Sequence, residues 1–219
     1  MRKYVDENHT HEMKDIIDFS LSPEVKNEIR LSILYTFVDY IESDGKCYID
    51  TGFIPNQDTR VISKAKLEHN SGNEFLFGAR SAIASNTYAY SNYTSSKCRT
   101  HYNKTYLDFD LEHDTTFTVD KNKNITTIND GINNGVIEHE YAIFTCPVSM
   151  YLFCVNNNGA ANSHSTASIY SMQIYDNDVL IRDFIPVYHN ILGEYGLYDR
   201  VNDIYYPNKG SGTLTGGKD

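Results

Sequence analysis

The chain has 219 residues, a hydrophobic share of 40% and a formal net charge of −10. This length and apolar content suffice for one sizeable domain with a small appendage. The negative charge repels phosphate backbones and anionic lipid heads, so we expect neither a nucleic-acid partner nor a membrane-surface partner. No apolar run approaches the ~20 residues of a membrane-spanning helix. The N-terminus turns acidic at once, without the apolar core of a signal peptide, so we expect synthesis in a cytoplasm.

Two histidines near the N-terminus, His9 and His11, are spaced two residues apart. In an extended strand, side chains at this spacing point to the same face. One chain makes a poor metal site of them, but three chains around a common axis would offer enough imidazoles for an octahedral transition-metal ion. We therefore predict a homotrimer with a transition metal bound on its axis by His9 and His11. An ordinary N-terminus with two solvated histidines is the alternative.

A helix is expected directly after this stretch, because Ser22 suits an N-cap and Pro23 the first helical position. An apolar stripe then recurs at a spacing of four residues. So short an arm offers this helix no partner of its own. We predict that residues 1–37 form a trimerisation arm with a three-helix bundle about the axis; packing of the helix on its own chain is the alternative. The stripe comprises Val25, Ile29, Ile33 and Phe37.

From about residue 38 the pattern changes to short alternating runs separated by turn residues, with no helical pattern between them. Strands at such spacing predict a mainly β fold, a jelly-roll sandwich spanning residues 38–219. We expect a stiff junction between arm and sandwich, because no Gly/Ser tract joins them. The expected strands are 48–52, 59–67, 74–80, 105–111, 115–119, 125–128, 148–155, 167–175 and 179–187.

Two parts of the sequence resemble known families. Asn-His-Thr-His at 8–11, followed by Ile16, Asp18 and Phe19, resembles an element of trimeric bacteriophage tail-fibre proteins. Residues 40–52, 180–187 and the glycine-containing stretches 196–199 and 210–213 resemble laminin-G-like (concanavalin A-like) jelly-roll domains of phage and gut-bacterial surface proteins. The resemblance implies a virion fibre or receptor-binding protein. Its arm would attach to a capsid or tail component, and its head would bind a bacterial surface glycan or protein or would decorate the virion.

Aromatic and polar side chains gather in a segment rich in Ser, Thr and Asn. Aromatic faces for stacking, with adjacent groups for hydroxyls, are typical of a sugar or protein contact surface. A plain half-exposed strand pair is the alternative. The candidate ligand-binding residues are Tyr88, Tyr90, Tyr93, Arg99, His101 and Tyr102.

Strand alternation places Asp108, Asp110, Glu112 and Asp114 on one face. Closely set carboxylates are what a retaining glycosidase needs, and the string superficially resembles the signature of laminarinase-type glycosidases. An Asp replaces the leading Glu, however, and the chain lacks the Trp residues that line those clefts. We therefore expect no enzymatic activity and ordinary titration of these carboxylates. The alternatives are a glycoside hydrolase on the same jelly roll and a bacterial surface adhesin module.

Calcium is a further possible cofactor. Asp176, Asn177, Asp178 and Asp130 offer hard oxygen ligands at predicted turns. They match no closed calcium loop, and acidic residues are common in turns for conformational reasons alone. The sequence therefore leaves a calcium site open without supporting it.

Overall fold

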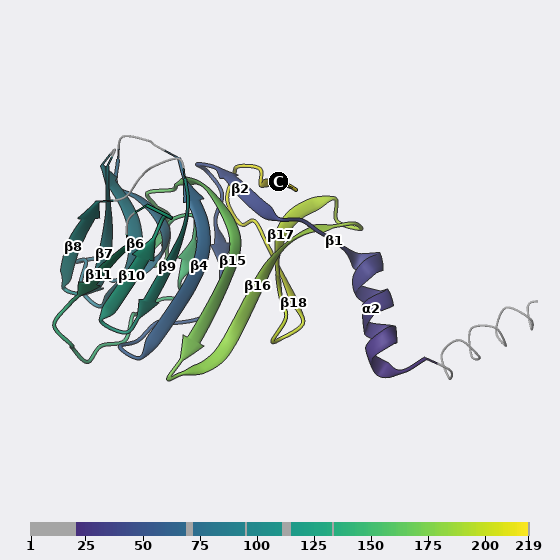
Figure 1. Cartoon of the computed structure of the whole chain (residues 1–219), viewed down its shortest axis with the longest axis horizontal. Helices are drawn as coiled ribbons and strands as arrows, with labels where there is room; N and C mark the ends of the chain where they lie inside the picture. The colour runs from purple at the N-terminus through teal and green to yellow at the C-terminus, as the bar shows by residue number, and fades with distance from the viewer. Residues whose placement is uncertain (1–20, 69–71, 95, 111–114, 133, 219) are drawn as a thin grey trace, which may run out of the picture.

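The computed structural model describes residues 21–68, 72–94, 96–110, 115–132 and 134–218. In these ranges two β-sheets face each other, and α2 (Pro23–Leu34) extends from one end of the sandwich (Figure 1). The predicted mainly β, jelly-roll sandwich is confirmed.

The larger sheet contains eleven of the described strands, and its main path runs β11-β10-β9-β4-β15-β16-β17-β18. Off this path, β1 pairs with β16, and β2 pairs with β15 and β19. Its strands are β1 (Tyr35–Phe37), β2 (Tyr40–Asp44), β4 (Thr59–Leu67), β9 (Thr116–Asn122), β10 (Ile125–Asn129), β11 (Asn134–Glu138), β15 (Thr166–Asp176), β16 (Val179–His189), β17 (Glu194–Asp199), β18 (Ile204–Pro207) and β19 (Thr215–Gly217).

The smaller sheet follows the order β14-β13-β5-β6-β7-β8, with β12 pairing with β3 and β5. Its pairings are antiparallel except for a short parallel contact between β13 and β5. The described strands are β3 (Ile49–Asp50), β5 (Glu74–Arg80), β6 (Thr87–Thr94), β7 (Lys97–Asn103), β8 (Thr105–Asp110), β12 (Tyr151–Leu152), β13 (Val155–Asn157) and β14 (Ala160–Asn162).

Residues 148–155, predicted as one strand, are divided between β12 and β13. The division falls at Phe153, whose φ of 64° lies in the left-handed region. Its amide donates to the carbonyl of Leu76 at 2.7 Å, and its side chain has 0% exposure. A buried contact therefore holds a conformation that interrupts the ladder, which the apolar pattern alone did not indicate.

The helix begins as predicted, with Ser22 accepting a hydrogen bond from the backbone amide of Val25 and Pro23 at its start. It packs on its own chain, however, through Leu31 and Leu34, which contact the cluster of Tyr35, Val187 and Tyr198. Strand β1 follows without a linker and pairs with β16, so the sheet already begins within the residues predicted as the arm.

The predicted apolar stripe of the helix faces solvent in this single chain. Val25 is 38%, Ile29 45% and Ile33 61% exposed. On the docked side, Arg30 forms an ion pair with Asp203 at 2.6 Å. The helix thus uses one face on its own sandwich and leaves a second apolar face uncovered.

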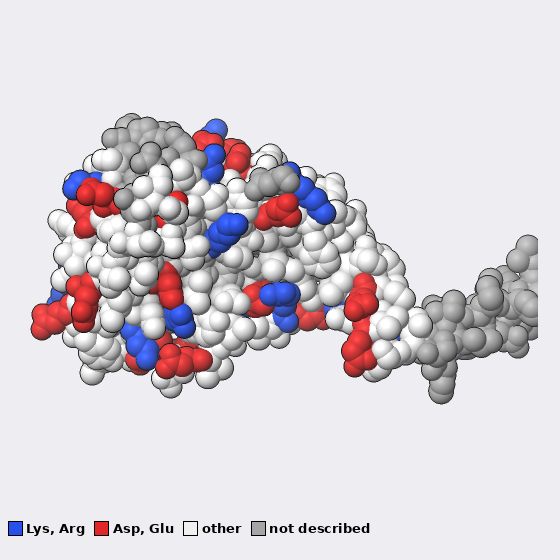
Figure 2. Space-filling view, in the orientation of Figure 1, with Lys and Arg blue, Asp and Glu red and all other residues white. Residues whose placement is uncertain are grey.

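Charge is distributed in small mixed groups on the face shown in Figure 2, where acidic and basic side chains lie near one another and between uncharged areas. A continuous basic patch of the kind used to bind nucleic acid is not visible on this face. Among the described residues, no helix is long and apolar enough to cross a membrane.

One lysine, Lys121 of β9, lies between the sheets with 0% exposure. Its ammonium donates to Thr100 Oγ1 at 3.0 Å and lies 4.6 Å from the ring centroid of Tyr88. No carboxylate of the described residues forms an ion pair with it. Burial disfavours the charged form and lowers the pKa of Lys121 to about 7.

We predict that Lys121→Met stabilises the protein at pH 7 and flattens its stability between pH 7 and 8.5. In this window the unfolded lysine binds more protons than the folded one, so wild-type stability should rise with pH, by on the order of 2 kcal/mol from this group. Urea unfolding of both proteins at the two pH values measures the effect. Parallel pH profiles for wild type and variant would contradict a depressed pKa for Lys121.

Candidate functional site

Side-chain alternation divides the six predicted ligand-binding residues between two faces of the smaller sheet. Tyr88, Tyr90 and Tyr102 point between the sheets and have 0% exposure. Tyr88 and Tyr102 are direct partners across β6 and β7, and the Tyr88 hydroxyl donates to the carbonyl of Lys121 in the facing sheet at 2.6 Å. The prediction that these three tyrosines form a contact surface is therefore wrong, because they are core residues.

Tyr93, Arg99 and His101 lie on the other face of the smaller sheet, where Tyr93 is exposed and Arg99 is only 9% exposed; their role in binding a ligand stays a prediction. The Arg99 guanidinium carbon lies 3.4 Å from the ring centroid of Tyr93 and 4.0 Å from that of Tyr106. Its Nε and one terminal nitrogen donate to Asp108 at 2.6 and 3.1 Å. Arg99 is thus held between two rings and neutralised by a carboxylate, an arrangement that fixes its position.

His101 is the neighbour of Tyr106 across β7 and β8, and its ring centroid lies 5.3 Å from that of Phe75. Burial lowers the pKa of His101 to about 3, and the nearby charges of Lys121, Arg99 and Arg80 act in the same direction. The imidazole is therefore neutral at physiological pH and can both donate and accept a hydrogen bond.

A hollow of about 270 Å³ opens beside these residues, and we call it the basic pocket. Its lining contains three cationic side chains and no carboxylate. The residues that line the basic pocket include Arg80, Thr87, Arg99, His101, Lys104 and Tyr106. The pocket therefore concentrates positive charge in a chain whose net charge is −10.

Arg80 differs from Arg99 in having no acidic partner. Its Nε donates to the neutral Asn157 side chain at 3.2 Å, and it forms no ion pair with a carboxylate in the described ranges. Burial lowers the pKa of Arg80. Thr87, only 3% exposed, also lines the pocket, and its hydroxyl has no hydrogen-bond partner in the described part of the chain. The pocket thus contains a cation and a hydroxyl that a ligand could satisfy.

Sequence reasoning missed Arg80, Lys104 and Tyr106. Tyr106 lies opposite His101 in the strand register, and Arg80 ends β5 on the far side of β6. Tyr106 precedes Asp108 by two residues, so the same alternation that grouped the carboxylates could have placed it on this outer face. No sequence pattern of this kind placed Arg80 beside the other residues of the pocket.

The predicted carboxylate row is only partly described. Asp108 and Asp110 share the outer side of β8, and Glu112 and Asp114 lie outside the described residues. We had expected Asp108 to titrate as an ordinary carboxylate, and this expectation is wrong. The hydrogen bonds that Asp108 accepts from Arg99 lower its pKa. A general acid of a glycosidase needs a raised pKa, so Asp108 is unsuited to that role. Asp110 faces Lys97 at 3.6 Å and has a side chain 84% exposed.

The predicted metal ligands His9 and His11 lie outside the described residues, and their site stays a prediction. Of the candidate calcium ligands, Asp176 accepts from the Asn56 amide at 2.9 Å and Asp178 pairs with Lys123 at 3.3 Å. In the ranges that the structure describes, no group of three or more His, Cys, Asp or Glu side chains could hold a metal ion.

We predict that Asp108→Asn lowers the free energy of unfolding by about 1 kcal/mol at pH 7, because it leaves Arg99 without its counter-charge. The difference from wild type should shrink on acidification, as Asp108 itself becomes protonated below its ordinary pKa range. Urea unfolding at pH 7 and pH 3 measures this. The matched control Asp110→Asn should change stability by less than about 0.5 kcal/mol; equal effects of the two variants would contradict the special role of Asp108.

No protein-family model matches the sequence, and a comparison with curated proteins gives no match. Among solved structures, the chain is similar to the CBM40 of Ruminococcus gnavus IT-sialidase bound to alpha2,3 sialyllactose, with 12% identity, a TM-score of 0.47 and coverage of 68% of this chain and 91% of that one. It is also similar to NanB sialidase of Streptococcus pneumoniae, with 15% identity, a TM-score of 0.45 and coverage of 67% of this chain but 27% of that one. Likenesses this remote carry no argument about the ligand of this chain.

Proposed function

We propose that this chain is a non-enzymatic glycan-binding module and that the basic pocket binds a sugar bearing a carboxylate. The observation that carries the proposal is Arg80, a partly buried guanidinium that lines the pocket and has no carboxylate partner among the described residues. A planar guanidinium matches a carboxylate through two parallel hydrogen bonds. A bound acidic sugar would supply the counter-charge that the described residues do not.

The other lining residues suit the rest of a sugar. Tyr106 is 57% exposed and offers a ring face beside the pocket, on which the apolar face of a pyranose could stack. Thr87 and Asn103 provide hydrogen-bonding groups for hydroxyls. The volume of about 270 Å³ lies below the roughly 300–1,000 Å³ of pockets for drug-sized ligands. We infer that one sugar ring enters the pocket and the rest of the glycan lies outside it.

Binding to a glycan array and calorimetric titration test the proposal, with sialyllactose against lactose and glucuronic acid against glucose as charged and neutral pairs. The acidic member of each pair should bind at least about tenfold more tightly, and Arg80→Gln should remove most of that preference, because a hydrogen bond to a charged group is worth roughly 1.5–3 kcal/mol. Tyr106→Ala should weaken the binding of both members of each pair.

The matched control is Lys66→Gln in β4 of the larger sheet. It also removes one positive charge, but this lysine does not line the basic pocket. It should leave binding unchanged. Equal affinity for acidic and neutral sugars, or equal effects of Arg80→Gln and Lys66→Gln, would contradict the proposal. Release of reducing sugar by the wild-type protein would contradict its non-enzymatic part.

We further propose that this module works in a virion, as the head of a homotrimeric fibre attached to a capsid or tail component through residues 1–37. Support comes from the apolar residues Val25, Ile29 and Ile33 left exposed on α2 and from the resemblance of residues 8–19 to phage fibre proteins. His9 and His11 would then share a transition metal on the axis.

Light scattering coupled to gel filtration should give three times the 25.0 kDa chain mass, and elemental analysis should find a transition metal. The double change Ile29→Glu and Ile33→Glu should yield monomers, because it places charges in the proposed helix–helix contact. Glu28→Gln serves as the control on the same helix and should stay trimeric. A wild-type monomer without metal would contradict the fibre proposal while leaving the basic pocket untouched.

A further inference from the structure

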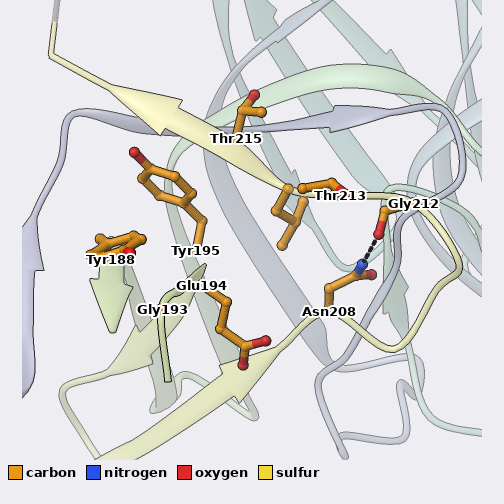
Figure 3. A pocket seen from close by; sticks show the side chains of 9 residues that line it. Tyr188, Gly193, Glu194, Tyr195, Asn208, Gly212, Thr213 and Thr215 are labelled. Atoms are coloured by element: carbon orange, nitrogen blue, oxygen red, sulfur yellow. Dashed lines mark hydrogen bonds between the residues drawn. The ribbon is translucent and has the colours of Figure 1, made fainter. Parts of the chain in front are cut away.

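A second hollow, of about 340 Å³, lies between the turn joining β16 to β17 and the segment that leads into β19. We call it the tyrosine pocket. It belongs to the β17 end of the sandwich, opposite the end that carries β7 and β8 (Figure 1). Figure 3 shows Glu194 and Asn208 along one side of the hollow and Tyr195 and Thr215 along the other.

Two tyrosine rings form a corner of this pocket. Tyr188 and Tyr195 are direct partners across β16 and β17, and their ring centroids lie 4.9 Å apart at an interplanar angle of 62°. The ring of Tyr195 lies against Gly216, where an added Cβ would approach within 2.9 Å of it. This close packing holds the ring in place, so the aromatic corner exists before any ligand binds.

The tyrosine pocket is acidic, whereas the basic pocket is cationic. Glu194 lines it, and no Lys, Arg or His does. Other carboxylates on β16, β17 and the turn after β17 have arginine partners: Asp203 pairs with Arg30, Asp199 with Arg182 and Asp183 with Arg200. Glu194 forms no ion pair within the described residues, and its Oε1 accepts a hydrogen bond from the Tyr205 hydroxyl at 3.4 Å. Its negative charge is therefore available to a ligand.

Elsewhere the protein places its own cations over tyrosine rings. Arg99 lies over Tyr93 and Tyr106, Lys64 lies 5.2 Å from the ring centroid of Tyr170, and Arg60 lies 5.6 Å from that of Tyr175. In the part of the chain that the structure describes, neither Tyr188 nor Tyr195 has such a cation. The tyrosine pocket thus combines two tyrosine rings that no cation of the described residues covers with a carboxylate that has no counter-charge among those residues.

We propose that the tyrosine pocket binds an organic ammonium group, as carried by choline or by an amino sugar. A cation within about 6 Å of a tyrosine centroid is attracted by the ring face, and Glu194 supplies the opposite charge. Asn208 shapes the neighbouring loop, since its amide donates to the carbonyl of Gly212 at 2.7 Å. The proposed ammonium site does not depend on the basic pocket, because the two pockets share no lining residue.

The test is an NMR titration of the full chain with choline and with 3,3-dimethyl-1-butanol, its uncharged analogue of the same shape. A second arm compares glucosamine with N-acetylglucosamine and so separates the two sources of the ammonium group. We expect choline, glucosamine or both to shift resonances of the pocket residues and to bind roughly five- to tenfold more tightly than the uncharged counterpart.

Glu194→Gln keeps the shape of the exposed side chain and should remove most of this preference, and Tyr195→Leu should weaken binding further. Glu138→Gln, at an exposed carboxylate of β11, is the matched control. Arg80→Gln should leave choline binding unchanged, so failure here and failure of the proposed glycan site can be distinguished. Equal binding of charged and uncharged probes, no binding of either ammonium probe, or an unaltered preference in Glu194→Gln would overturn the proposal.

Discussion

The alternation of side chains along β6 and β7 is the constraint on which both the core and the basic pocket depend. It directs Tyr88, Tyr90 and Tyr102 between the sheets, where their rings are part of the hydrophobic core. The same register turns Arg99 and His101 to the outside. A slip of one residue would exchange the two sets, burying a guanidinium without a counter-charge and exposing three large rings. Because that exchange is so unfavourable, packing of the tyrosines fixes the positions of Arg99 and His101 on the other face.

Arg80 and Arg99 show how the same side chain serves two purposes on one sheet face. Arg99 lies between two rings and is paired with Asp108, so its charge is neutralised within the fold. Its part in the pocket is to line it with a side chain held in a fixed position. Arg80 is stabilised by a neutral amide and by burial of its stem. A partly desolvated cation without a counter-charge is unfavourable in the free protein. An anion that reached Arg80 would therefore gain more than it would at the neutralised Arg99, and for this reason we place the proposed ligand on the Arg80 side of the pocket.

The sequence was most informative where a pattern is local. The predicted ranges 59–67 and 74–80 coincide with β4 and β5, and Ser22 begins the helix as predicted, because period-two alternation and N-cap chemistry are properties of adjacent residues. It was least informative on which face is inside. Residues two apart share a face, but nothing local says that the face of Tyr88 is buried. Arg80 joins the pocket only through the pairing of β5, β6 and β7, a non-local property that strand patterns do not contain.

Net charge and local charge have different consequences for this protein. A charge of −10 repels an extended polyanion, since such a ligand meets the summed field of the whole surface. At physiological salt that field decays over about 8 Å. A single carboxylate inside the basic pocket would therefore respond mainly to Arg80 and Lys104, while an ammonium group in the tyrosine pocket would respond mainly to Glu194. A net charge that disfavours nucleic acid is thus compatible with a small acidic ligand, because the two ligands are governed by charges at different distances.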